Sequence, residues 1–138
     1  MYLLDTDTLT YLHAGHRRVI ERLQRAQSGN VATTIITKLE ILRGRMDALL
    51  KAATGAQLLP AQQFFLQSAQ LLDEILITPV DPTAATIFDK LRQAKLGKIG
   101  QADLLIASIA LANKAVLVTR NRKHFEKIPG LAIENWVD

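Results

Sequence analysis

The sequence predicts an α/β fold with three layers, in which helices cover both faces of a central, mainly parallel sheet. Short runs of apolar and β-branched residues alternate with longer segments of helical periodicity. This alternation favours parallel strands, because each parallel connection needs a crossover that a helix can supply. We expect residues 1–138 to form a single domain, because no linker or repeat interrupts the pattern.

Five segments have the composition of short buried strands. The first is Tyr2–Leu4, which runs directly into Asp5. The others are 31–35, 75–77, 115–119 and 131–133. Ligands of open α/β sheets bind beyond the carboxyl ends of the strands, so Asp5 is the first candidate site residue.

Two helices are predicted between the first and second strands. Residues 8–14 form a short helix that stops at Gly15, and residues 19–26 continue an amphipathic helix that ends at 28–30. The positions of this second helix that are not apolar include four arginines: Arg17, Arg18, Arg22 and Arg25.

The next two helices connect the second strand to the third. Thr37 and Glu40 match a capping box, which predicts a helix start at Thr37. Gly55 is expected to close this helix, and Pro60 to start another that buries Phe64 among other apolar residues.

Two further helices are predicted after the third strand. Asp81 as a cap and Pro82 in the first turn begin a helix that stops at Gly97. Residues 100–103 then open a helix that is almost entirely apolar from 104 to 112, so it should be central.

Composition excludes several classes of protein. The absence of cysteine excludes disulfides, thiolate zinc sites and cysteine nucleophiles. Asp5 and Asp7 interrupt any N-terminal signal peptide, so we expect a soluble, cytoplasmic protein. Lys and Arg outnumber Asp and Glu by 17 to 13, which is compatible with a polyanionic partner. Aromatic residues are only 5%, so contacts with RNA should use phosphates more than base stacking.

Three acids lie at predicted element boundaries: Asp5, Glu40 and Asp103. Each has a structural explanation, as a helix cap, as a capping-box partner, or as a charge that favours a helix dipole. Each also lies in apolar sequence, where a carboxylate needs a partner or a cation. If the three converge, oxygen ligands of this kind favour Mg²⁺ or Mn²⁺, which can activate water against a phosphate.

The segment after the fourth strand adds polar and basic candidates. Thr119, Asn121 and His124 either orient water and phosphate beside the acids or form a polar turn that caps a short helix. The basic residues around them are either RNA contacts or a solvated loop: Arg120, Arg122 and Lys123. The two other histidines, His13 and His16, lack the spacing and the third partner of a zinc site.

Together these segments resemble PIN-domain ribonucleases, most closely the VapC toxins of bacterial type II toxin–antitoxin systems. The matching segments, in order, are 3–9, 36–44, 103–110, 117–125, 128–131 and 134–136. The resemblance implies a PIN-like fold and an Mg²⁺- or Mn²⁺-dependent endoribonuclease, with Asp5, Glu40 and Asp103 as metal-binding acids. It also implies a homodimer and a cognate antitoxin whose tail blocks the site.

Two positions depart from the family pattern. Family members often have asparagine where this chain has Asp7, which makes Asp7 an auxiliary group or an extra ligand. Many have a fourth acid before a phenylalanine, where this chain has His124 and Phe125. We therefore expect a weaker second metal site, if the family's second ion binds at all.

Two rival functions remain open at this level. A PIN-fold module that binds RNA or a partner without cutting is compatible with the missing fourth acid. A haloacid-dehalogenase-type phosphatase would use Asp5 as nucleophile and Asp7 as acid and base. However, only 19 residues follow Thr119, and they contain no closing acidic pair of the kind that such phosphatases need.

Overall fold

The structure, a computed structural model, describes residues 1–138 apart from the side chain of Ser28. Its strands are β1 (Tyr2–Leu4), β2 (Val31–Thr34), β3 (Leu76–Thr78), β4 (Val116–Val118) and β5 (Ala132–Glu134). Its α-helices are α1 (Thr6–His13), α2 (Arg17–Arg25), α3 (Ile35–Lys51), α4 (Gly55–Asp73), α5 (Pro82–Gln93), α6 (Gln101–Ala112) and α7 (Arg122–Phe125). A 3-10 turn, η1 (Ser28–Asn30), precedes β2.

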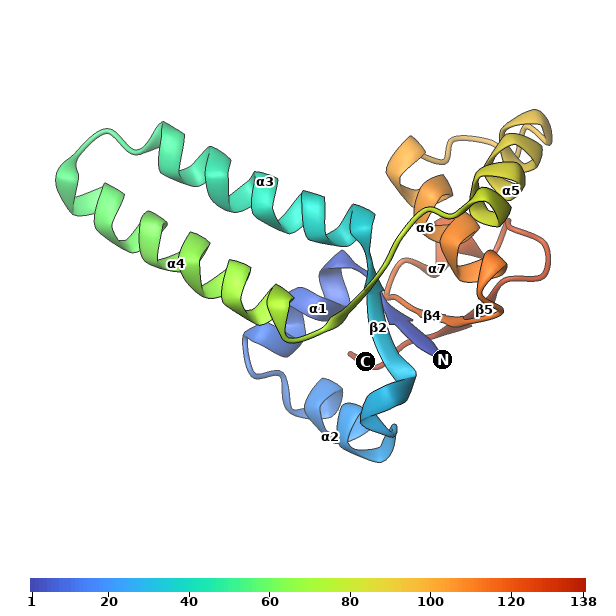
Figure 1. Ribbon diagram of the computed structural model, residues 1–138, viewed down its shortest axis with the longest axis horizontal. Helices are drawn as coiled ribbons and strands as arrows, with labels where there is room; N and C mark the ends of the chain where they lie inside the picture. Colours follow the sequence, from blue (N-terminus) through green and yellow to red (C-terminus); the bar gives the residue numbers. More distant parts are fainter.

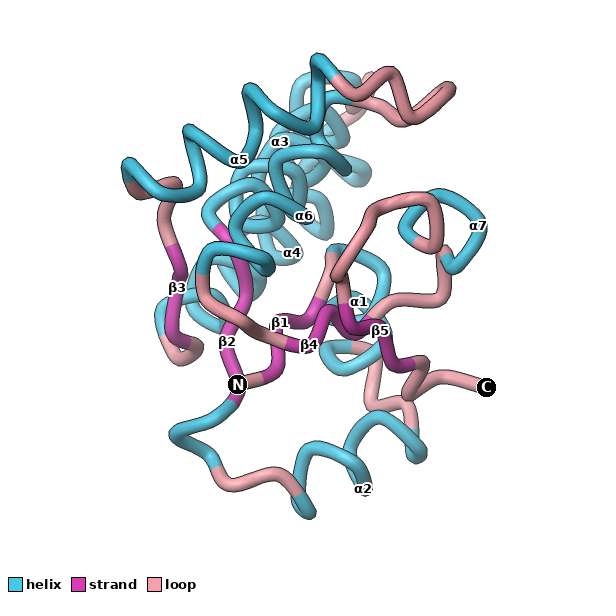
Figure 2. Tube along the Cα trace, turned by 90° about the vertical axis from the view of Figure 1, so that its right-hand side faces the viewer, coloured by secondary structure: helices cyan, strands magenta, loops and turns pink.

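The five strands form one parallel sheet in the order β3-β2-β1-β4-β5 (Figure 2). In the central strand, Leu3 pairs with Ala32 on one side and with Leu117 on the other. Because all pairs are parallel, every strand presents its carboxyl end at the same edge of the sheet. The predicted fold class, with its three layers, is confirmed.

Two hydrophobic cores lie on opposite faces of the sheet, and consecutive residues of β1 enter different cores. Leu3 belongs to the core beneath α5 and α6, with Ile109 and Phe125. Leu4 belongs to the core that includes Leu9 of α1, Val19 of α2 and Trp136. This division follows from the strand repeat, which points successive side chains to opposite faces. As predicted, α6 is central: Ile106–Ala110 is buried.

The start of α3 differs from the prediction. The helix begins at Ile35, and its cap is Thr34, whose hydroxyl accepts the N–H of Thr37 at 3.1 Å. The proposed capping box of Thr37 and Glu40 is therefore wrong. Glu40 lies in the second turn and is free to contact another element.

The connection between α3 and α4 also differs from the prediction. Gly55 is the first residue of α4, and Pro60 lies inside the helix. Thr54 caps α4 by accepting the N–H of Gln57 at 3.2 Å, while the Gln57 side chain accepts the N–H of Ala53 at 2.8 Å. This reciprocal cap starts the helix before Pro60, so the proline lies inside α4, where it cannot donate a backbone hydrogen bond.

The two long helices α3 and α4 pack as an antiparallel pair that projects from the sheet (Figure 1). Many apolar side chains on this pair face solvent, including Leu50, Leu59 and Leu66. Phe64, predicted to be buried, is 54% exposed. No helix in residues 1–138 is long and apolar enough to span a membrane, among those that the structure describes.

Candidate active site

Asp5 lies at the carboxyl end of β1 and is also the cap of α1. Its Oδ1 accepts the N–H of Thr8 at 2.8 Å, and the hydroxyl of Thr119 hydrogen-bonds to the same carboxylate. Burial raises the pKa of Asp5 above its ordinary value, and these hydrogen bonds offset only part of that effect. The negative charge of Asp7 raises the pKa of Asp5 further. Asp5 is thus a buried acid without a cationic neighbour among its described contacts.

Buried threonines hold the strand ends around Asp5 in place. The hydroxyl of Thr8 donates to the carbonyl of Val118 at 3.0 Å, and that of Thr33 donates to the carbonyl of Leu4 at 2.6 Å. These bonds link α1 to β4 and β2 to β1. Because their donors are buried and satisfied, they fix the backbone on both sides of Asp5.

Glu40 reaches the site from α3. Its Oε1 accepts the hydroxyl of Thr6 at 2.7 Å, and the same hydroxyl lies 3.2 Å from that of Thr37. Thr6 follows Asp5 directly in the chain. The structure therefore brings Glu40 to the first turn of α1, beside Asp5 in sequence, and leaves its carboxylate exposed.

Asp103 lies in the first turn of α6 and contacts α7. Its Oδ2 lies 3.3 Å from Nδ1 of His124, and the amide nitrogen of Asn121 lies 2.9 Å from the same ring atom. The N–H of Asn121 in turn donates to the hydroxyl of Thr119 at 2.9 Å. A continuous series of polar contacts therefore runs from Asp5 through Thr119 to Asp103.

The three acids share the carboxyl edge of the sheet but are not gathered around one point. Within the part of the chain that the structure describes, no three acidic, histidine or cysteine side chains are placed as a metal-binding group. The donors themselves are of the right kind, since carboxylate oxygens suit Mg²⁺ and Mn²⁺. A cation beside Asp5 would also compensate its buried charge.

Comparisons with known proteins agree with this architecture. The family model described as "PIN domain" matches residues 2–131. The chain belongs to the PIN-domain family. Among curated relatives, Ribonuclease VapC2 of Rickettsia felis is 31% identical over 143 residues, covering 99% of this chain and 98% of the relative. The tRNA(fMet)-specific endonuclease VapC of Salmonella typhimurium is 26% identical, covering 98% of this chain and 97% of the relative.

A solved structure of a VapC relative is also similar to this chain. VapBC2 from Rickettsia felis, bound to a DNA fragment from its promoter, has a chain that is 29% identical to this one, with a TM-score of 0.78. The match covers 98% of each chain. The resemblance to the VapC branch of the PIN-domain family is therefore confirmed.

The basic residues predicted to contact RNA are not equivalent in this PIN domain. The guanidinium of Arg120 donates to Asp138 at 3.2 Å and to the Tyr11 hydroxyl at 2.7 Å. Its hydrogen bond with Asp138 raises the pKa of Arg120 above its ordinary value. Arg122 lies 3.9 Å from Glu126 in an exposed pair, and Lys123 is exposed. Arg122 and Lys123 are thus more available to an RNA phosphate than Arg120.

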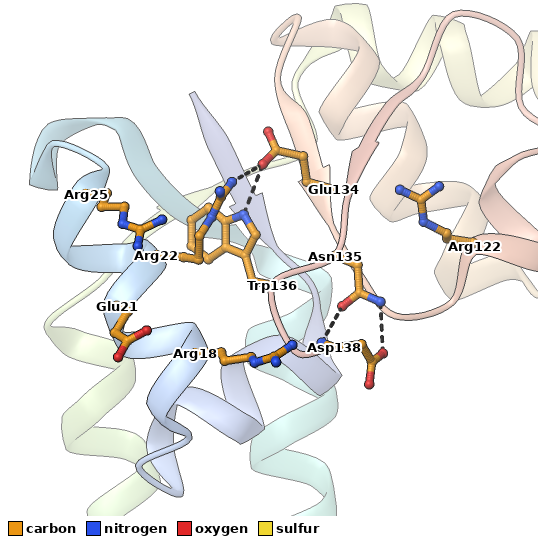
Figure 3. Close-up of a pocket in the computed structure, with 9 residues that line it drawn as sticks. All are labelled: Arg18, Glu21, Arg22, Arg25, Arg122, Glu134, Asn135, Trp136 and Asp138. Atoms are coloured by element: carbon orange, nitrogen blue, oxygen red, sulfur yellow. Dashed lines mark hydrogen bonds and ion pairs between the residues drawn. The ribbon is translucent and has the colours of Figure 1, made fainter.

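Sequence reasoning assigned no role to the arginines of α2. Three of them line a pocket together with Arg122, beside the carboxyl end of β5 (Figure 3). The sequence feature that could have indicated this pocket is the spacing of Arg18, Arg22 and Arg25, which places the three side chains on one face of a helix. Thr6, the partner of Glu40, was also missed.

Proposed function

We propose that this chain is a metal-dependent endoribonuclease and the toxin of a toxin–antitoxin pair. The observation that carries the proposal is the burial of the Asp5 carboxylate at the carboxyl edge of the sheet. The charge of Asp7 acts on this carboxylate and raises its pKa further. Polar contacts connect Asp5 to Asp103 on one side, and Thr6 links it to Glu40 on the other. The names of the VapC relatives, a ribonuclease and a tRNA(fMet)-specific endonuclease, supply the substrate class.

Asp5, Glu40 and Asp103 would hold the cation. Bound there, Mg²⁺ or Mn²⁺ would acidify a water molecule and offset the charge that develops on an RNA phosphate. The chain contributes the fixed position of Asp5, which the Thr8 N–H and the Thr119 hydroxyl hold. This preorganisation keeps one acid in place while Glu40, which is exposed, adjusts to the ion.

Asn121 and His124 would position groups around Asp103. Their contacts place an amide and an imidazole next to this carboxylate, where many family members have a fourth acid. An amide and an imidazole there would orient water or phosphate but add no negative charge. We therefore propose that a second ion binds more weakly here than in four-acid relatives, and that Asp7 remains auxiliary.

Partner proteins would cover the apolar side chains of α3 and α4. Leu59 and Leu66 are 70% and 60% exposed, and they line one surface hollow of α4. Large apolar side chains left exposed together are typical of protein interfaces. The solved VapBC neighbours are complexes of a toxin with its antitoxin. We propose a cognate antitoxin and a second copy of this chain as the occupants of these surfaces.

A non-cutting RNA-binding module is the second candidate. The separation of the three acids, none of which joins a described metal-binding group, favours it. The two candidates differ in whether new RNA ends appear.

The test is to sequence RNA 5′ ends after a short pulse of expression in cells. The nuclease proposal expects new 5′ ends at a small set of sites with wild type, and at least a 100-fold reduction with Asp5→Asn. The control Asp73→Asn removes an exposed acid at the end of α4, which is distant in sequence from the three candidate acids. This variant should cut RNA like wild type. Identical end profiles for wild type and Asp5→Asn would favour the non-cutting module.

A further inference from the structure

A pocket of about 470 Å³ lies between α2 and the segment that follows β5. Four arginines line it, Arg18, Arg22 and Arg25 from α2 and Arg122 from α7, and they outnumber the three acids of the lining, Glu21, Glu134 and Asp138. Figure 3 shows these side chains entering from both sides, with Glu134, Asn135 and Trp136 between them. We refer to this hollow as the arginine pocket.

Two of the arginines on α2 have no structural role that the described contacts show. Arg22 builds the wall: it forms an ion pair with Glu134 and lies over the Trp136 ring, 5.5 Å from its centroid. Among the residues that the structure describes, no carboxylate lies within ion-pair distance of Arg18 or Arg25. The acid on which the charge of Arg18 acts is Asp138, whose pKa this charge helps to lower. Both side chains are exposed, so they are available to an anion from solution.

Arg122 connects the arginine pocket to the candidate active site. It is the first residue of α7, the helix that also carries His124 beside Asp103. The N–H of Thr119 donates to the carbonyl of Glu134 at 2.9 Å, so the pocket lies at the same sheet edge as Asp5. From β1 to β5 is two strand spacings, roughly 10 Å. An extended RNA strand at Asp5 would therefore pass close to the pocket.

The lining selects phosphate rather than a base. Guanidinium groups match the geometry of phosphate oxygens and remain charged at any physiological pH. Trp136 is buried, with only 3% of the residue exposed, so it offers no face for base stacking. An anion with several phosphates spaced along a chain would engage Arg18, Arg25 and Arg122 together.

We propose that the arginine pocket binds neighbouring backbone phosphates of the RNA substrate, away from the phosphate that is cut. This inference rests on the proposed ribonuclease function and adds a second point of contact on the RNA. Such contacts position a nucleic acid without reading its sequence. Arg18, Arg25 and Arg122 make the contact, and Arg22 holds the wall of the pocket.

The test uses labelled bulk tRNA and the full chain carrying Asp5→Asn, so that bound RNA is not cut. Arg18→Gln combined with Arg25→Gln should weaken binding at least tenfold. It should also lower the slope of log K against log salt concentration by about 1.5, since each phosphate contact contributes about 0.7–0.9. The control Lys51→Gln/Arg92→Gln removes the same charge at exposed positions outside the pocket and should change the slope far less.

Three results would overturn the proposal. They are an unchanged slope in the Arg18/Arg25 variant, an equal loss in both double variants, and no binding of tRNA by the parent chain. Loss of antitoxin affinity with an unchanged RNA slope would identify an acidic protein segment as the occupant instead. Cleavage by the chain with wild-type Asp5 is measured in parallel. If the chain with wild-type Asp5 cleaves RNA but the Arg18/Arg25 variant keeps the parent's salt slope, only the pocket proposal is overturned. If the slope changes but the chain does not cleave RNA, only the nuclease proposal is overturned.

Discussion

Asp5 has two roles at the scale of single residues. It caps α1 through the Thr8 N–H, and it places a buried negative charge at the carboxyl edge. The first role stabilises the fold, whereas an uncompensated buried charge destabilises it. Asparagine at this position would keep the cap and remove the charge, because asparagine and aspartate cap helices almost equally well.

We predict that Asp5→Asn raises the melting temperature of the metal-free chain at pH 7, whereas Asp5→Ala lowers it. Burial raises the pKa of Asp5, so its folded state favours the protonated form. That stability is present below the unfolded pKa and is lost as pH rises through the folded pKa. The advantage of Asp5→Asn should therefore shrink toward pH 4. Alanine loses the cap, about 1 kcal/mol.

Thermal denaturation in EDTA at pH 4 and pH 7 measures both effects. Wild type, Asp5→Asn and Asp5→Ala should separate at pH 7, in the order asparagine, wild type, alanine. If asparagine and alanine lower the melting temperature equally at pH 7, then the carboxylate stabilises the fold and this account of its burial is wrong.

At the scale of helices and strands, local patterns predicted every strand start to within one residue, whereas most helix starts were misplaced by two residues or more. Asp81 does cap α5, by accepting the N–H of Ala84 at 2.7 Å, as the pairing with Pro82 indicated. The α3 start was wrong because two threonines compete for the cap position, and β2 ends at Thr34, one residue before the predicted end of the strand. That strand boundary depends on β3, so no local rule could place it.

We predict that the hydroxyl of Thr34 stabilises α3. Thr34→Ala should lower the free energy of unfolding by about 1 kcal/mol, because the N–H of Thr37 loses its acceptor. Thr34→Ser keeps the hydroxyl and should lose less. Urea denaturation of the three proteins separates the hydroxyl from the methyl group. Equal losses in serine and alanine would show that packing, not capping, determines the effect.

The candidate site was predictable in part, for a related reason. The acids could be placed at one edge from strand order alone, because parallel strands end together. Their partners could not be predicted, since these pair distant parts of the chain. Thr6 lies 34 residues from Glu40, and Arg120 lies 18 residues from Asp138.

At the scale of the whole molecule, β1 joins the two cores. Leu3 and Leu4 are both fully buried, and they pack on opposite faces of the sheet. If β1 leaves the sheet, both cores lose a buried side chain and become exposed to water. We therefore propose that residues 1–138 unfold as a single domain.

This proposal predicts coincident unfolding transitions by two optical probes. Trp136 is the only tryptophan and belongs to the core that contains Leu4. Far-ultraviolet circular dichroism reports on all helices, including α5 and α6 on the other face. Both signals should give the same urea midpoint. Separate midpoints would mean that the two faces unfold independently.

The central claim is that the acids at the carboxyl edge support metal-dependent cleavage of RNA. The most direct measurement is cleavage of end-labelled tRNA by the purified chain, first in EDTA and then with Mn²⁺ or Mg²⁺ added back. We predict no cleavage in EDTA, cleavage after metal addition, and at least a 100-fold lower rate for Asp103→Asn with a similar melting temperature. Equal cleavage with and without metal, or equal rates for wild type and Asp103→Asn, would contradict the account.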